Sequence, residues 1–215
     1  MTASAPTVFI VDDDAPLCRA LARLLREHGW PTAAYASAED FLAQRDAQTP
    51  GCLVLDVSLP GLDGLALQRR LAQDGPAPPI IFLTGHGDIP MSVQAVKAGA
   101  LDFLTKPVSA ESLLAAVRAG VAQDALARRS LSETVALRER FAGLTQRERE
   151  VLAALAAGKL NKQIAGDMNV VEQTVKFHRA RIMERMQAHT VAELMHMLAR
   201  LELAQDNPPT ATPRP

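Results

Sequence analysis

The sequence predicts an α/β fold in which a parallel sheet of five strands is covered by helices and followed by a region of helices only. Two observations support this prediction. Over about 120 residues, short apolar runs alternate five times with amphipathic segments, which is typical of an open parallel sheet with helices on both faces. From Ser109 onward, apolar residues recur at helical spacing. A chain of 215 residues can form two domains of modest size.

The first half contains the elements of the sheet in a regular order. The runs "VFIV" and "IIFL" are apolar throughout, as expected for strands buried on both faces. The expected strands are Thr7–Val11, Thr32–Tyr35, Cys52–Asp56, Ile80–Thr84 and Asp102–Leu104. The expected helices are Pro16–Glu27, Ala38–Gln44, Leu65–Ala72 and Met91–Ala98. Pro16 suits the first turn of a helix, and Gly29 and Gly99 suit the ends of helices.

The second half is predicted to be helical throughout. A run without proline extends from Ser109 to about Phe141 and suggests that the last helix of the first domain continues as a linker. Thr145 with Glu148, and Thr190 with Glu193, have the spacing of capping boxes at the starts of two further helices. The segments between them are a helix ended by Gly158, a short "NKQIAGDM" segment and the helix "EQTVKFHRARIMERM". The proline-rich tail "NPPTATPRP" is expected to be disordered.

Charge divides the chain in the same place. Residues 1–125 carry 9 basic and 14 acidic side chains, a net of −5, and residues 126–215 carry 14 basic and 10 acidic ones, a net of +4. This asymmetry suggests two domains with different partners. Cys18 and Cys52 form no CxxC pair, so neither a disulfide framework nor a zinc site is indicated. Without a basic-then-apolar leader or an uncharged apolar run of roughly 18 residues, we expect a soluble, cytoplasmic protein.

Polar residues end the expected strands. Asp12 and Asp13 follow the first strand, Asp56 ends the third, Thr84 ends the fourth, and Lys106 follows the fifth. In an open parallel sheet, ligands bind beyond the carboxyl ends of the strands. Three carboxylates in one crevice would repel one another unless a hard divalent cation lay among them, and oxygen ligands in a small site favour Mg²⁺. Each aspartate alone could be a turn former or a helix cap, but all five residues at the proper strand ends favour a functional site.

A carboxylate in such a site can act as a nucleophile toward phosphorus and form an aspartyl phosphate. That chemistry needs a metal ion, a cation to neutralise the phosphoryl oxygens and a hydrogen-bond donor. Lys106 and Thr84 fit the last two roles. Asp14, which precedes Pro16, is better explained as a helix cap.

The first half resembles the receiver domains of bacterial two-component response regulators, which have a flavodoxin-like (βα)5 fold. The resemblance rests on "IVDDD", "LDVSLPGLDG" and "LTGHGDIPMSVQAVKAGALDFLTKP". It implies that Asp56 is the phosphoacceptor and that Asp12, Asp13, Asp56 and the Ser58 backbone carbonyl hold magnesium. It further implies that Thr84 and Lys106 contact the phosphoryl group, that Phe103 is the aromatic switch residue, and that the Lys106–Pro107 peptide is cis.

Other interpretations of this half stay open. The run Asp12–Asp14 also fits the DxD of haloacid-dehalogenase-type phosphatases, in which the first aspartate would be the nucleophile, although that family needs a larger fold with a cap. His86 lies in a glycine-rich loop, where a structural role is more common than a catalytic one. By resemblance, the helix that contains Met91, Val93 and Val96, with the strand after it, is the face through which active receivers dimerise. Lys97 and Asp102 are candidates for its polar contacts.

Residues 144–186 have the layout of a helix-turn-helix. On "EQTVKFHRARIMERM", Val175, His178, Ile182 and Met186 recur at the spacing of a buried stripe, so His178 is better explained as structural. The opposite side would face DNA in the major groove. Phe177 could contact a thymine methyl group and Lys176 could donate to guanine, whereas Lys162, Arg179 and Arg181 are better placed for phosphates. The candidate DNA contacts are Lys162, Gln173, Thr174, Lys176, Phe177, Arg179, Ala180 and Arg181.

This half resembles the LuxR-type DNA-binding domain. Together the two resemblances indicate a response regulator of the NarL/FixJ family, in the subgroup of the nitrogen-fixation and aromatic-degradation regulators. One departure is Val171, where the family usually has serine before the recognition helix. Loss of such a cap costs on the order of 1 kcal/mol, so either Asn169 or Glu172 compensates or the helix is frayed until DNA orders it. A helical interaction module and a quorum-sensing regulator are the alternatives for this half.

The resemblances imply a transcription regulator rather than a metabolic enzyme. We expect a receiver domain at residues 5–121, a linker helix at 122–141, a LuxR-type DNA-binding domain at 142–205 and a tail at 206–215. The implied partners are a sensor histidine kinase, which would phosphorylate Asp56, and double-stranded DNA with a two-fold symmetric operator. Phosphorylation would promote formation of a homodimer and promoter binding, and the implied cofactor is Mg²⁺.

Overall fold

The structure is a computed structural model that describes residues 5–74, 77–85 and 95–206, with side chains to residue 201. The chain divides into two compact units, one that ends at Arg128 and one that begins at Arg129. Within the described ranges, no helix combines the length and the apolar composition needed to cross a bilayer.

The first unit is built on a parallel sheet of five strands in the order β2-β1-β3-β4-β5. The strands are β1 (Thr7–Val11), β2 (Thr32–Tyr35), β3 (Gly51–Asp56), β4 (Ile80–Thr84) and β5 (Asp102–Thr105). Each predicted strand is confirmed, and the bounds of β3 and β5 differ from the prediction by one residue at one end. This strand order brings the ends of β1 and β3 next to each other.

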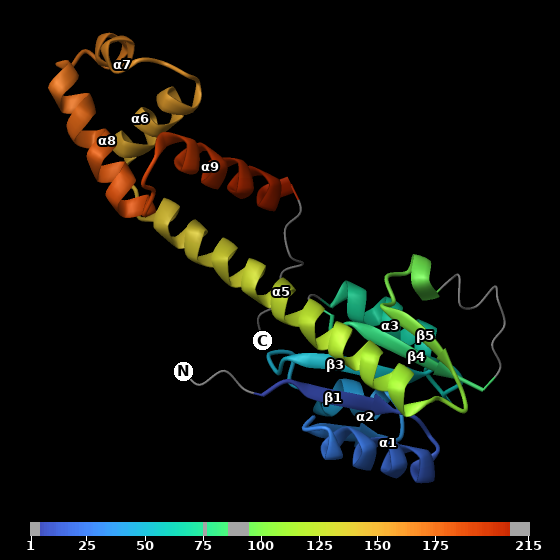
Figure 1. Cartoon of the computed structure of the whole chain (residues 1–215). Coiled ribbons are helices and arrows are strands. Elements are labelled where there is room, and N and C mark those ends of the chain that lie inside the picture. Colours follow the sequence, from blue (N-terminus) through green and yellow to red (C-terminus); the bar gives the residue numbers. More distant parts are fainter. Residues whose placement is uncertain (1–4, 75–76, 86–94, 207–215) are drawn as a thin grey trace. The chain divides into compact units, whose positions relative to one another are not determined.

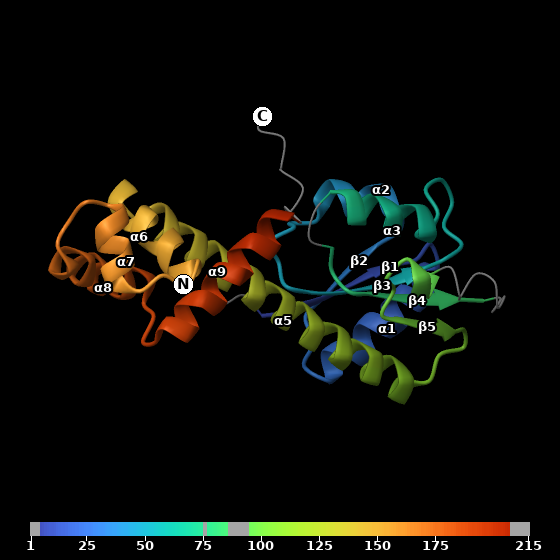
Figure 2. The same cartoon turned by 90° about the horizontal axis from the view of Figure 1, so that it is seen from above.

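Helices cover both faces of this sheet (Figures 1 and 2). Helices α1 (Ala15–Glu27) and the first part of α5 (Ala110–Ala142) lie on one face, and α2 (Ala38–Gln44) and α3 (Gly64–Gln73) lie on the other. Successive residues of β1 alternate between two cores: Val8 and Ile10 pack toward α1 and α5, whereas Phe9 and Val11 pack toward α2 and α3. The predicted doubly covered sheet is therefore confirmed.

The residues predicted at the two ends of α1 are found there. Asp14 caps α1, where its carboxylate accepts a hydrogen bond from the Leu17 backbone N–H at 2.9 Å. Gly29, with φ of 83°, follows the end of α1. Most of the helix predicted at Met91–Ala98 lies outside the described residues, but residues 95–97 are helical.

Asp124 and Arg128 clamp α5 to the start of β3 and to the loop before it. The carboxylate of Asp124 accepts hydrogen bonds from the Gly51 backbone N–H at 2.9 Å and from Arg128 Nε at 2.8 Å. The guanidinium of Arg128 also donates to the backbone carbonyls of Ala47, Gln48 and Thr49. The first unit therefore holds α5 as far as Arg128, which lies within the segment predicted as a linker.

The second unit consists of the end of α5 and the helices α6 (Gln146–Ala156), α7 (Asn161–Asp167), α8 (Glu172–Met186) and α9 (Val191–Asp206). Their apolar faces enclose one core, which includes Leu137, Val151, Ile164, Ile182 and Leu194. The prediction of helices only in this half is confirmed.

The two predicted capping boxes of the second unit differ in the structure. The box of α6 is complete: Thr145 Oγ1 accepts from the Glu148 N–H at 3.3 Å, and Glu148 accepts from the Thr145 N–H at 2.8 Å. At α9, Thr190 accepts from the Glu193 N–H at 3.1 Å, but the Glu193 carboxylate accepts from the N–H of His189 rather than of Thr190. The second predicted box is therefore displaced by one residue in its second half.

Candidate functional site

Three carboxylates gather at the carboxyl end of the sheet. Asp12 and Asp13 follow β1 and Asp56 is the last residue of β3, and these two strands are neighbours. Each carboxylate offers an oxygen within 4.8 Å of an oxygen from each of the other two. Asp12 and Asp56 are buried, with 1% and 6% of their surface exposed, and Asp13 is exposed. Oxygen donors at this separation fit a small hard cation.

Lys106 joins two of these carboxylates. Its Nζ lies 2.6 Å from Asp12 Oδ2 and 3.3 Å from Asp56 Oδ2, and the Lys106–Pro107 peptide that follows is cis. Burial raises the pKa of Asp12 above its ordinary value, and the hydrogen bond from Lys106 offsets this only in part. Burial alone would lower the pKa of Lys106, but the bond to Asp12 and the two negative charges outweigh it, so this pKa is raised. The lysine is therefore charged at neutral pH.

Thr84 and Phe103 lie on the two neighbouring strands β4 and β5. Thr84 is buried at the end of β4, and its backbone carbonyl accepts from the Lys106 N–H at 2.7 Å. The ring of Phe103 is half-buried and lies 6.1 Å, centroid to centroid, from that of Phe82. The sheet thus brings the predicted hydroxyl, lysine and aspartates to one edge.

Where the loop after β3 meets α3, Gly64 lies very close to the Asp56 backbone, a feature that the sequence analysis did not predict. A Cβ atom on Gly64 would lie 2.3 Å from the Asp56 backbone carbonyl oxygen, and the Gly64 N–H bonds to the Val57 carbonyl at 3.1 Å. Only glycine fits there without displacing the backbone of Asp56. The loop also contains Ser58, which is exposed, and its tip is tied to α2 by a bond from the Leu62 N–H to Glu39 at 3.1 Å.

The predicted dimerisation residues are only partly described. Met91, Val93 and also His86 lie outside the described residues. Lys97 is exposed, and the carboxylate of Asp102 accepts a hydrogen bond from the N–H of the next residue at 2.8 Å. Val96, beside Lys97, is 55% exposed, so at least this part of the predicted face presents an apolar side chain to solvent.

Helix α8 has one buried and one exposed side. The predicted stripe is buried at Val175, Ile182 and Met186 and half-buried at His178. The side chains predicted to face bases are exposed, except that Thr174 is half-buried; the exposed ones are Gln173, Lys176, Phe177 and Ala180. Phe177 is 57% exposed, so much of its ring is open to contact with a partner.

Basic side chains adjoin this exposed side. The Arg181 guanidinium lies 5.6 Å from the centre of the Phe177 ring, and Arg179 lies 3.4 Å from the Asn161 side-chain oxygen of α7. Lys162 of α7 is exposed. Cations and an exposed aromatic ring on adjoining helices suit a surface that meets nucleic acid.

Val171 occupies the N-cap of α8 and makes no side-chain capping bond. The expected compensation by Asn169 or Glu172 is not seen: Asn169 has φ of 52° and Glu172 forms an ion pair with Lys176 at 3.2 Å. The helix nevertheless begins at Glu172, with the Thr174 N–H bonded to the Val171 carbonyl at 2.9 Å.

Family comparisons account for both units. The family model of the response regulator receiver domain matches residues 8–118, and that of the bacterial regulatory proteins of the luxR family matches residues 142–198. The chain is 41% identical over 202 residues to the response regulator protein TodT of Pseudomonas putida strain F1, which covers 94% of this chain and 89% of TodT. It is 43% identical over 201 residues to nodulation protein W of Bradyrhizobium diazoefficiens, which covers 93% of this chain and 88% of that protein.

A solved structure is also similar. The low-resolution structure of the response regulator StyR has 42% sequence identity and a TM-score of 0.82, and the match covers 92% of this chain and all of that one. The receiver match implies a sensor kinase partner, and the luxR-family match implies DNA binding. The phosphatase and helical-module alternatives are therefore wrong, because the family regulates transcription and is not a family of metabolic enzymes. The chain belongs to the NarL/FixJ-type transcriptional response regulators of two-component systems, which join a receiver domain to a luxR-family DNA-binding domain.

Proposed function

We propose that Asp56 accepts a phosphoryl group from a sensor histidine kinase and that the acyl phosphate so formed activates DNA binding. The observation that carries this proposal is the contact of Lys106 with both Asp12 and Asp56 at the carboxyl ends of β1 and β3. An Asp56 oxygen would attack phosphorus while the bond from phosphorus to the kinase's histidine nitrogen breaks. Lys106, already charged and at hand, would neutralise the phosphoryl oxygens, and the Thr84 hydroxyl would donate to one of them.

The donor set fits Mg²⁺. We assign Asp12, Asp13, Asp56 and the Ser58 backbone carbonyl as its ligands, because three carboxylate oxygens lie within 4.8 Å of one another and all are hard donors. When bound, the metal ion would offset the negative charge that gathers in the transition state. Asp12 and Asp13 would hold it, and burial of Asp12 and Asp56 would keep competing water out.

The response would travel from Thr84 to Phe103. Movement of Thr84 toward the phosphoryl group would leave space into which the half-buried ring of Phe103 rotates. This change would reshape the surface formed by Met91, Val93, Lys97 and Asp102, through which two phosphorylated chains form a homodimer. Two DNA-binding units would then meet a two-fold symmetric operator.

The second unit would read DNA through α8. Gln173, Thr174, Lys176, Phe177 and Ala180 would face base edges in the major groove, with Phe177 against a thymine methyl group. Lys162, Arg179 and Arg181 would contact phosphates, and they would supply affinity without sequence information.

The proposed domain boundaries follow the division into a receiver half and a DNA-binding half. We propose a receiver domain at residues 5–121, a linker helix at 122–141, the DNA-binding domain at 142–205 and a tail at 206–215. The charge asymmetry of the two halves and the two family matches support this order. We also propose that the protein acts in the cytoplasm, where DNA and the kinase's phosphoryl donor would be found.

The test is DNA capture from the source genome with the purified full-length protein. It is run with Mg²⁺ and beryllofluoride as phosphoryl mimic, without the mimic, and with Asp56→Ala. We expect a few two-fold symmetric sites that appear only with the mimic and are lost in the variant. Equal capture in every condition would refute activation through Asp56 and leave a phosphorylation-independent DNA-binding protein.

The phosphorylated residue is tested separately. Asp56→Asn should abolish incorporation of phosphate from a small acyl-phosphate donor and phosphate-dependent dimerisation, whereas Asp74→Asn, a change at an exposed aspartate outside the acidic cluster, should still incorporate phosphate. Incorporation that survives Asp56→Asn and is lost in Asp12→Asn would contradict the assignment.

A further inference from the structure

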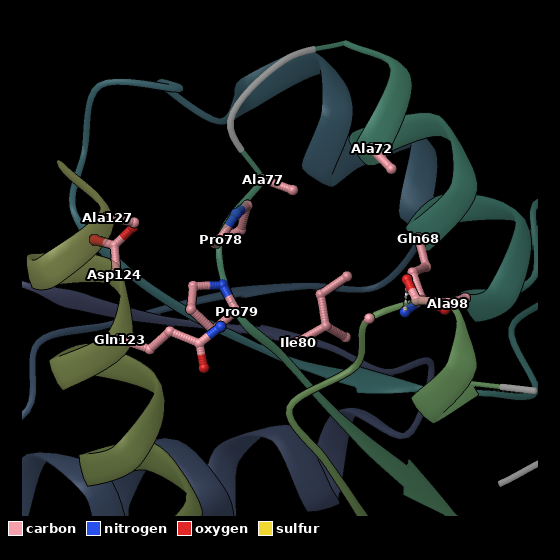
Figure 3. A pocket seen from close by; sticks show the side chains of 11 residues that line it. Gln68, Ala72, Ala77, Pro78, Pro79, Ile80, Ala98, Gln123, Asp124 and Ala127 are labelled. Atoms are coloured by element: carbon pink, nitrogen blue, oxygen red, sulfur yellow. Dashed lines mark hydrogen bonds between the residues drawn. The ribbon is translucent and has the colours of Figure 1, made fainter. Parts of the chain in front are cut away.

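A cavity of about 220 Å³ lies in the first unit, at the amino-terminal edge of the sheet. It is bounded by α3, the start of β4, the turn around Ala98 and Gly99, and α5 (Figure 3). The edge is opposite the one that holds the carboxylates. Most of its lining is apolar, and the two buried polar side chains in its wall are Asp124, which belongs to the clamp described above, and Gln68.

Among the described residues, only the nitrogen end of the Gln68 side-chain amide forms hydrogen bonds. The residue is 4% exposed, and its Nε2 donates to the backbone carbonyls of Ala95 and Ala98, each at 3.2 Å. Figure 3 shows Gln68 beside Ala98. Both acceptors are carbonyl oxygens, so only the nitrogen end of the amide can satisfy them. The buried Gln68 Oε1 has no hydrogen-bond partner in the described part of the chain.

The two carbonyls belong to the end of a helix. Residues 95–97 are helical, Gly99 has φ of 91°, and the N–H groups of Gly99 and Ala100 bond to the carbonyls of Val96 and Ala95 at 2.9 and 3.0 Å. This is the bonding pattern of a Schellman motif. The motif provides no donor for the Ala98 carbonyl, which Gln68 supplies from α3.

The two donated bonds are buried or part-buried, and a carbonyl that loses its donor in such a place loses stabilisation. An apolar side chain of similar length would occupy the same region beside the cavity but would make neither bond. The glutamine is therefore best explained by its two donated bonds, which fix the position of the helix end relative to α3.

We propose that Gln68 is a positioning residue for the dimerisation surface. Val96 and Lys97 lie between the two carbonyls that it holds, and both are exposed to solvent. By tying Ala95 and Ala98 to α3, the amide keeps these two side chains in the arrangement that a second chain meets. The inference rests on the proposed function, since it concerns the surface through which phosphorylated chains pair.

The test compares Gln68→Met with Gln73→Met in the full-length protein. Both changes remove a side-chain amide from α3, but Gln73 is exposed. Amide hydrogen exchange at Gly99 and Ala100 is followed by NMR without any phosphoryl mimic. Dimerisation with Mg²⁺ and beryllofluoride is followed by sedimentation equilibrium, and phosphate incorporation at Asp56 is measured in parallel.

We expect Gln68→Met to speed exchange and to weaken the dimer by about five- to tenfold, the effect of roughly one lost hydrogen bond. Phosphate incorporation should be unchanged, and Gln73→Met should match the natural protein in every measurement. Unchanged exchange in Gln68→Met, or faster exchange with an unchanged dimer, would overturn the proposal. If the natural protein does not dimerise with the mimic, the proposed dimerisation fails, and the exchange rates alone decide whether Gln68 holds the helix end.

Discussion

Replacement of Lys106 by methionine should destabilise the first unit in metal-free buffer. The change keeps the length of the side chain but removes the charge that lies 2.6 Å from Asp12 and 3.3 Å from Asp56. At an effective dielectric constant of about 20, unit charges 3.3 Å apart attract by roughly 5 kcal/mol, and desolvation cancels much of this. Loss of one partner of a buried pair costs about 3–5 kcal/mol. Because the lysine side chain is 22% exposed, we expect about 2–3 kcal/mol.

Urea unfolding followed by tryptophan fluorescence measures this loss. Trp30 is the only tryptophan of the chain, and it packs against the core between the sheet, α1 and α5, so it reports on the first unit. With a slope of about 2 kcal/mol per M, the midpoint should fall by about 1 M. The exposed Lys97, changed to methionine, is the matched control and should shift stability by less than about 0.5 kcal/mol.

The loss of stability in Lys106→Met should depend on pH. The pKa of Asp12 is already raised by burial, and loss of Lys106 should raise it further. A raised carboxyl pKa contributes stability below the unfolded value, and this contribution is lost as pH rises through the folded value. The deficit of Lys106→Met should therefore be small near pH 4 and large near pH 8, and Mg²⁺ should reduce it. Equal midpoints in chelator at pH 8, or a deficit that is largest in acid, would refute this reasoning.

Two other variants probe the close approach behind Asp56, the proposed phosphoacceptor, and the start of the DNA-binding unit. Gly64→Ala should destabilise the first unit by more than about 2 kcal/mol and lower phosphate incorporation, because its Cβ would meet the Asp56 carbonyl oxygen at 2.3 Å; Gly85→Ala, whose Cβ meets nothing within 4 Å, should leave the urea midpoint unchanged. Glu148→Gln should cost about 1 kcal/mol at pH 7, as measured by thermal unfolding of the helical circular dichroism signal. The backbone N–H of Thr145 holds the pKa of Glu148 below its ordinary value, so its contribution is present above the unfolded pKa and lost as pH falls through the folded one. A difference between Glu148→Gln and the natural protein that persists undiminished at pH 3 would contradict this account.

The elements that sequence could predict are those specified by local pattern. The apolar runs of β1 and β4 and the caps at Asp14 and Thr145 depend on residues only a few positions apart, and they were predicted within one residue. Convergence of Asp12 and Asp56 followed from the rule that ligands bind beyond the carboxyl ends of parallel strands. In each case the structure follows from the order of residue types along the chain.

Features that depend on distant backbone were not predictable. Nothing near Asp124 indicates that it accepts a bond from Gly51, 73 residues earlier, or that Gln68 donates to carbonyls 27 and 30 residues later. Backbone carbonyls carry no sequence signal, so side chains that bind them resemble ordinary polar residues on helices. The bond from the His189 N–H to Glu193 was missed for a similar reason, because the sequence does not show whether His189 or Thr190 is the donor.

The clamp of Asp124 and Arg128 has a practical consequence for the construction of hybrid regulators. The family match to the receiver ends at residue 118, and a splice there would discard the carboxylate that accepts from the Gly51 N–H. Gly51 tolerates no side chain, since a Cβ would lie 1.8 Å from the Thr7 carbonyl oxygen, so its neighbours have little room to adjust. A foreign DNA-binding domain should therefore be joined after Arg128. The first unit then keeps Asp124 and Arg128 and can be transferred between regulators with its own stabilising contacts.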